Sequence, residues 1–156
     1  MDVPIDFAKV SPRGVLDIAI AAEQEAEEHY DALVDRMERA GNADAARFFR
    51  RMAGLEHLHR TQVAERRKAL FGDAPPDLRH RFPWAVEVPA DSADSRTSLR
   101  EALGISLAAE RRAFAYYQGA IEFVTDAVTE KLFAELRDAE ADHARLIEAE
   151  LARVGS

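Results

Sequence analysis

The chain has 156 residues, of which 47% are hydrophobic and 32% are charged, a balance that fits one soluble globular domain with a real core. The absence of cysteine excludes disulfides, iron–sulfur clusters, thiolate zinc sites and a catalytic cysteine, and it fits a reducing compartment. The net charge of −8 argues against nucleic acid as a partner. The sequence does not start like a signal peptide, and no apolar run approaches the roughly 20 residues of a membrane span, so we expect a cytoplasmic protein with no membrane partner.

Glycine and proline are few and clustered, which predicts an all-α fold in one domain over residues 1–156. Ser11, followed by proline, can cap the first helix, and Gly41 ends it. Ser98 and Glu101 form a capping box before the third helix, and Asp126 caps the fourth. The expected helices span residues 12–40, 43–72, 99–124 and 126–154, and the loop 73–98 holds four of the six prolines.

The lengths of the connections predict how the helices are arranged. The links after the first and third helices are short, and short links join antiparallel neighbours. Helices of this length extend about 40 Å, and the central loop can reach roughly 80 Å when extended. We therefore expect an antiparallel four-helix bundle in which a long crossover makes the second and third helices parallel.

Each predicted helix carries an apolar stripe in alternating steps of three and four residues, which is typical of a side facing the core. A carboxylate or an imidazole interrupts every stripe near its middle. Counted at 1.5 Å per residue, the carboxylates all lie about 20–25 Å from the nearest turn, so they share one layer. The interrupting residues are Glu23, Glu56, His59, Glu110, Glu140 and His143.

A buried layer of four carboxylates is very unfavourable, because each loses its hydration and the charges repel one another. A pair of divalent cations would neutralise the layer, so we predict these six residues as metal ligands. Carboxylates with two imidazoles suit iron or manganese, and zinc also fits. In each Glu-x-x-His motif both side chains share a helix face and can bind one ion while the carboxylate bridges to the next. Without metal, we expect raised pKa values among the four glutamates.

The two halves of the sequence repeat this pattern. Tyr30 follows Glu23 by seven residues, Tyr117 follows Glu110 by seven, and a Glu-x-x-His motif comes about 30 residues after each glutamate. Two such helix pairs related by a pseudo-twofold axis would supply equivalent ligands to each metal. Tyr30 and Tyr117 are therefore candidates for hydrogen bonds to ligands on neighbouring helices.

Four segments resemble the rubrerythrin branch of the ferritin-like di-iron superfamily, namely residues 22–30, 55–59, 124–136 and 139–143. The resemblance covers nearly the whole chain except residues 1–11 and the loop. It implies a ferritin-like bundle with a di-iron centre that reacts with dioxygen or hydrogen peroxide, and it also implies a homodimer.

The sequence departs from that family in two places. Rubrerythrins carry a cysteine-rich iron domain, which a chain without cysteine lacks, so electrons would come from an external donor or from free ferrous iron. Rubrerythrins also have an extra glutamate three residues after the third-helix ligand, where this chain has Ala113. The remaining set of four glutamates and two histidines is similar to bacterioferritin sites. Bacterioferritins also bind haem through a methionine, but Met52 gives no support for such a haem ligand in this chain.

These observations predict a non-haem di-iron oxidoreductase that detoxifies peroxide or dioxygen. Two alternatives use the same residues differently: a ferroxidase for iron storage or delivery, and a metal-free structural or interaction bundle. Outside the six ligands, we expect His29, His57 and His80 at the surface, and Glu27 could serve as an extra ligand.

Overall fold

The computed structural model describes residues 5–77 and 95–155, with side chains from residue 99 onward in the second range. All regular structure in these ranges is helical. The elements are η1 (Phe7–Lys9), α1 (Pro12–Arg39), α2 (Ala43–Phe71), α3 (Ser95–Ala120), η2 (Ile121–Phe123) and α4 (Ala127–Val154). None of these helices is long and apolar enough to cross a membrane.

Side-chain caps fix three of the helix starts at the expected places. Ser11, Asn42 and Asp126 each accept a hydrogen bond from the backbone N–H three residues later. The expected start of the third helix at residue 99 was wrong, because α3 already begins at Ser95 and Ser98 lies inside its first turn. No glycine or proline separates these two serines, so nothing in the sequence prevents the earlier start.

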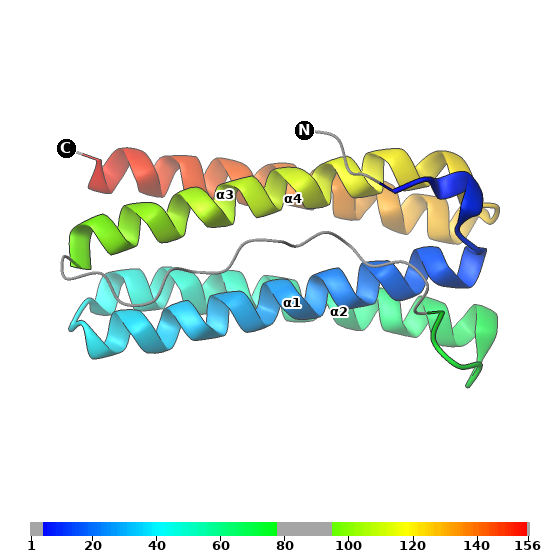
Figure 1. Cartoon of the computed structure of the whole chain (residues 1–156), viewed down its shortest axis with the longest axis horizontal. Helices are drawn as coiled ribbons and strands as arrows, with labels where there is room; N and C mark the ends of the chain where they lie inside the picture. Colours follow the sequence, from blue (N-terminus) through cyan, green and yellow to red (C-terminus); the bar gives the residue numbers. More distant parts are fainter. Residues whose placement is uncertain (1–4, 78–94, 156) are drawn as a thin grey trace.

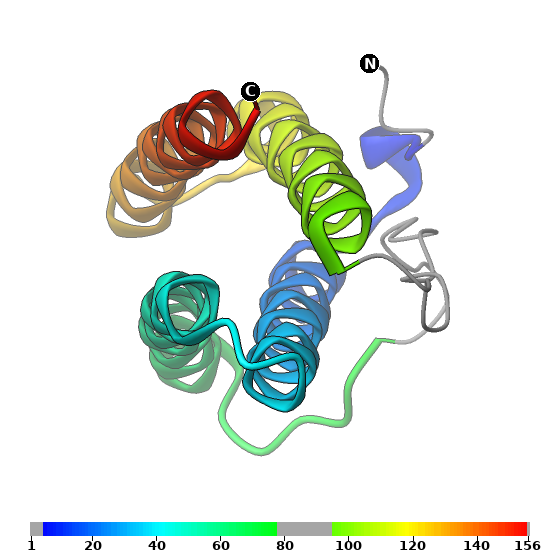
Figure 2. The ribbon, with the colours of Figure 1, turned by 90° about the vertical axis from the view of Figure 1, so that its left-hand side faces the viewer.

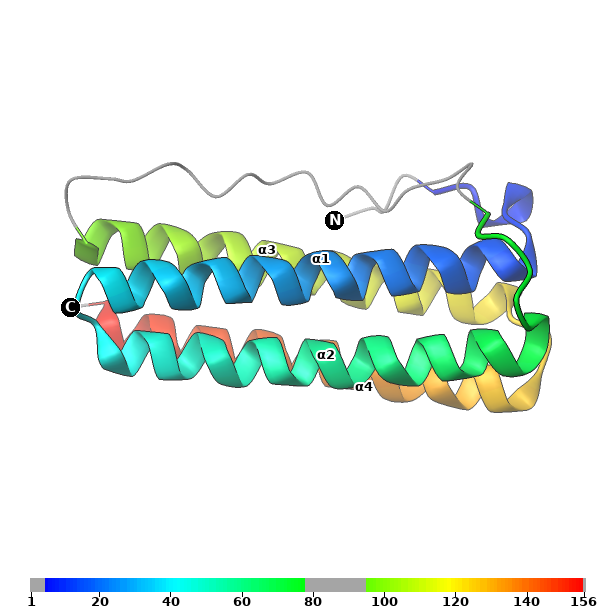
Figure 3. The same cartoon turned by 90° about the horizontal axis from the view of Figure 1, so that it is seen from below.

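The four long helices form a bundle with the arrangement predicted from the connection lengths. α1 and α2 run antiparallel, as do α3 and α4, and each pair packs along its length (Figure 1). In the end-on view α3 lies beside α1 and α4 lies beside α2 (Figure 2). α2 ends at the opposite end of the bundle from the start of α3, so these two helices are parallel (Figure 3). The long crossover is thereby confirmed.

The core consists of two apolar clusters separated by a polar layer. One cluster, toward the start of α1, includes Leu16, Val63 and Phe133. The other, toward the start of α2, includes Leu33 and Phe49. The residues between the clusters on all four helices are the six predicted ligands, so apolar packing above and below fixes their height.

Arg67 holds the first part of the crossover against α1. Its guanidinium, in a residue only 9% exposed, donates to Asp17 at 2.9 Å and to the carbonyl oxygens of Gly72, Ala74 and Pro75. Asp17 also accepts the backbone N–H of Asp77 at 2.8 Å. This buried ion pair was not predicted from the sequence.

Candidate metal centre

The six predicted ligands converge in the middle of the bundle. Each is at most 6% exposed, and the four glutamates are at most 2% exposed. Glu23 comes from α1, Glu110 from α3, and the two Glu-x-x-His motifs from α2 and α4. Because three residues nearly complete a helical turn, the glutamate and histidine of each motif both point into the bundle.

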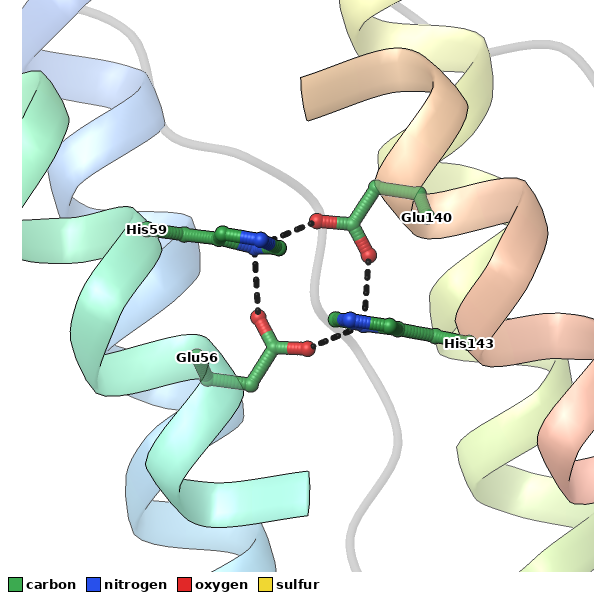
Figure 4. Close-up of side chains that lie close together, drawn as sticks. All are labelled: Glu56, His59, Glu140 and His143. Carbon is green, nitrogen blue, oxygen red and sulfur yellow. Dashed lines mark ion pairs between the residues drawn. The ribbon is translucent and has the colours of Figure 1, made fainter. Parts of the chain in front are cut away.

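Glu56 and Glu140 each face both imidazoles (Figure 4). Glu56 places Oε2 at 3.8 Å from Nδ1 of His59 and Oε1 at 2.9 Å from Nδ1 of His143. Glu140 places Oε1 at 3.5 Å from Nδ1 of His59 and Oε2 at 3.5 Å from Nδ1 of His143. A carboxylate that offers one oxygen to each of two imidazoles has the arrangement that bridges a pair of metal ions.

Glu23 and Glu110 each face only one imidazole. Glu23 Oε2 lies 3.6 Å from His59 Nδ1, and Glu110 Oε2 lies 3.4 Å from His143 Nδ1. Their other oxygens accept hydrogen bonds of 2.5 Å from tyrosines on the neighbouring helix pair, Glu23 from Tyr117 and Glu110 from Tyr30. The centre therefore has two equivalent half-sites, Glu23 with His59 and Glu110 with His143, which share the remaining two glutamates.

Most of the inward atoms lack a hydrogen-bond partner among the described residues. They are Glu23 Oε2, Glu56 Oε1, both carboxylate oxygens of Glu140, and Nδ1 of both histidines. The contact of 2.9 Å between His143 and Glu56 is close but is not aligned as a hydrogen bond. Leaving buried polar atoms unpaired costs about 1–3 kcal/mol each, and a cation at the point where their lone pairs meet would remove that cost. The donor set thus fits a pair of metal ions.

Burial and the neighbouring charged groups shift the pKa values of all six ligands. Burial, and then repulsion from neighbouring carboxylates, raises the pKa of Glu56 and Glu140 well above the usual range. Burial opposes protonation of His59, but the attraction of the surrounding carboxylates outweighs it and raises its pKa to about 12. The pKa of His143 is raised for the same reasons.

The expectation of raised pKa values was wrong for the other two glutamates. Burial raises the pKa of Glu23, but its interactions with the neighbouring Glu56 and His59 outweigh burial, and the net pKa is lowered. For Glu110, the interactions with Glu140 and His143 outweigh burial and lower the pKa to about 2. The pKa is therefore raised at the glutamates that face both histidines and lowered at those that accept from tyrosines.

The family model for rubrerythrin matches residues 14–151, which is most of the chain. The chain belongs to the rubrerythrin family. Its fold is similar to that of a hypothetical protein from Pyrococcus furiosus, with a TM-score of 0.77 and 21% identity, covering 96% of this chain and 93% of that one. It is also similar to a bacterioferritin from Rhodobacter capsulatus, described with a metal-free dinuclear site and a haem iron. That match has a TM-score of 0.73 and 24% identity, and covers 90% and 83% of the two chains. No curated protein sequence matches.

These likenesses confirm the ferritin-like bundle, and the rubrerythrin family together with the buried glutamate–histidine cluster indicates a dinuclear metal site. In this rubrerythrin-family chain the position three residues after Glu110 is the buried Ala113, which is 7% exposed. An alanine there offers no further oxygen, so Glu110 is the carboxylate that this part of α3 supplies.

Two other polar residues, His29 and Glu27, lie differently from the expectations. His29 is half-buried rather than at the surface, and its ring nitrogen Nε2 lies 2.9 Å from Ser106 Oγ. Burial lowers the pKa of His29 to about 4. His57 is exposed as expected and contacts Glu27, which is bound on its other oxygen by Arg60 rather than facing the six ligands. His80 lies outside the described residues.

Proposed function

We propose that this protein is a non-haem di-iron oxidoreductase that reduces hydrogen peroxide or dioxygen. The observation that carries the proposal is the pair of equivalent half-sites, whose buried oxygens and nitrogens converge without hydrogen-bond partners. Membership of the rubrerythrin family supports iron as the metal. Electrons would come from an external donor, because the chain has no cysteine to hold a second iron centre. We also propose a cytoplasmic homodimer, by resemblance to the family.

Each ligand has a distinct role in this proposal. Glu23 and His59 would hold one ion, Glu110 and His143 the other, and Glu56 and Glu140 would bridge them. The bound iron pair would supply the electrons that reduce the oxidant. Tyr117 holds one oxygen of Glu23, and Tyr30 holds one oxygen of Glu110. In each glutamate the other oxygen therefore stays turned toward the imidazole. The apolar clusters on both sides keep bulk water away.

A ferroxidase that stores or delivers iron is the second candidate. The likeness to a bacterioferritin and the alanine at position 113 favour it, because both point to a ligand set without the extra glutamate. The two functions differ in what happens after oxidation. An iron-storing protein would accumulate many ferric ions inside a large shell, which size-exclusion chromatography with iron analysis detects. A peroxide reductase would remain a small oligomer and turn over repeatedly with an electron donor.

The proposal is tested by loading the protein with ferrous ion without oxygen and then mixing it with peroxide. We expect uptake of about two ferrous ions per chain and rapid peroxide consumption. His59→Ala and His143→Ala should each lower uptake and rate by at least about tenfold, because each removes a direct ligand. Leu58→Ala is the matched control, since Leu58 lies on the same helix but is 52% exposed. Equal uptake in all three variants would contradict the proposal.

A further inference from the structure

The pseudo-twofold relation allows the two helix pairs to be compared position by position. Four residues after Glu23, α1 has Glu27, and four residues after the equivalent Glu110, α3 has Phe114. One residue after the bridging glutamate, α2 has His57 and α4 has Ala141. One residue after the ligand histidine, α2 has Arg60 and α4 has Ala144. The two pairs therefore share their ligands but differ in the side chains that surround them.

On the α1–α2 pair these positions form a closed polar triad. Glu27 Oε1 lies 2.9 Å from His57 Nδ1, and Glu27 Oε2 accepts from Arg60 Nε at 2.9 Å. Arg60 Nη2 lies 3.0 Å from the same His57 nitrogen. The side chain of Glu27 is 19% exposed, so the guanidinium and the imidazole cover much of it. The triad links α1 to α2 across their outer surface.

On the α3–α4 pair the same positions line a pocket of about 390 Å³. Phe114, Ala141 and Ala144 form its apolar part, and its lining also includes Glu110 and Glu140, which are two of the six ligands. Among its charged residues, Arg111 pairs with Glu148 at 3.2 Å and Arg145 pairs with Asp142, so both positive charges are balanced. Balanced positive charges and an apolar part suit a small uncharged molecule better than a cation.

We infer that small uncharged oxidants reach the metal centre through the pocket between α3 and α4, and that Glu27, His57 and Arg60 close the equivalent route between α1 and α2. The inference rests on the proposed function and adds its path of access. The two half-sites are consequently equivalent in their ligands but unequal in access, because the pocket lining includes Glu110 and not Glu23. The oxidant first meets the ion held by Glu110 and His143.

The absence of native cysteine allows a reversible test. Ala144→Cys places a thiol in the pocket wall with little change in size, and benzyl methanethiosulfonate then adds a bulky group as a mixed disulfide. Thiol reduction followed by desalting removes the block. Thr61→Cys is the matched control, because Thr61 is exposed on α2 at the position equivalent to Arg145. Equilibrium ferrous uptake, the rate of peroxide consumption and the rate of ferrous removal by bipyridine are measured before and after modification.

We expect the blocked Ala144→Cys protein to bind as much ferrous ion as the unblocked protein, but to lose at least about tenfold in both rates. Reduction should restore both, and the blocked Thr61→Cys protein should be unaffected. Arg60→Ala, added to the blocked Ala144→Cys protein, should recover part of both rates by opening the other side. Unchanged rates after blocking would overturn the route, and no recovery with Arg60→Ala would overturn the closing role of the triad. A protein that binds iron but does not consume peroxide would refute the proposed function. The rate of ferrous removal by bipyridine would still test whether the pocket is the route to the metal centre.

Discussion

The charge balance of the six ligands is set residue by residue. Without metal, the pKa is raised for Glu56, Glu140 and both histidines and lowered for Glu23 and Glu110. The raised values favour protons on the first four groups, and the lowered values favour charge on the other two. Divalent cations can bind only when those protons leave, so protons and metal compete for the same atoms.

This competition predicts that ferrous binding releases protons and weakens as the pH falls. The sign follows from the raised pKa values, because a group that holds its proton more tightly is harder to deprotonate at low pH. Calorimetric titration in buffers with different ionisation enthalpies measures the released protons. Glu56→Gln, which cannot titrate at that position, should release fewer. Proton release near zero would contradict this account of the apo state.

The tyrosine hydrogen bonds give a second prediction at this scale. Tyr117→Phe removes the donor to Glu23 without changing the size of the ring, so ferrous affinity should fall about 10–100-fold. Tyr116→Phe is the matched control, because the hydroxyl of this equally buried neighbour donates to the Val15 carbonyl instead of a ligand. Ferrous titration separates the two variants. A fall in affinity that is the same in both would mean that Tyr117 acts only through packing.

At the scale of single helices, Arg67 of α2 is the residue that ties the end of α2 to α1. Arg67→Ala would leave Asp17 charged and without its guanidinium partner in a largely buried position, which costs roughly 3–5 kcal/mol. It would also release the carbonyl oxygens of Gly72, Ala74 and Pro75 from their donor. We expect a lower urea midpoint and faster proteolytic cleavage just after α2. Arg51 is exposed, so the free energy of unfolding of Arg51→Ala should stay within about 0.5 kcal/mol of the parent protein. An equal loss of stability in Arg51→Ala and Arg67→Ala would contradict a special role of Arg67.

Patterns within single helices predicted most of the fold and of the site. Helix breakers, caps and seam periodicity gave the starts of α1, α2 and α4 and placed six polar residues in one layer. The start of α3 could not be predicted in the same way, since Ser95 and Ser98 are both acceptable helix starters and only tertiary context chooses between them. Contacts that depend on the arrangement of whole helices, such as Arg67 with Asp17 and His29 with Ser106, leave no periodic signal.

At the scale of the whole molecule, metal binding should contribute to stability. Apo protein holds several unpaired polar atoms in its centre, and a ligand that binds only the folded state at 100 times its dissociation constant adds about 2.7 kcal/mol. Anaerobic ferrous ion should therefore raise the melting temperature by several degrees, and chelation should reverse the change. The His59→Ala variant should show no such shift. A melting temperature insensitive to ferrous ion would favour the metal-free bundle.

The central claim is that the four buried glutamates and two histidines hold a pair of iron ions. Anomalous diffraction at the iron edge, from crystals grown with ferrous ion without oxygen, tests it most directly. We predict a pair of iron peaks in the polar layer, one beside Glu23 and His59 and one beside Glu110 and His143, with Glu56 and Glu140 bound to both. Iron found only at surface carboxylates, with the layer between the apolar clusters empty, would contradict the account.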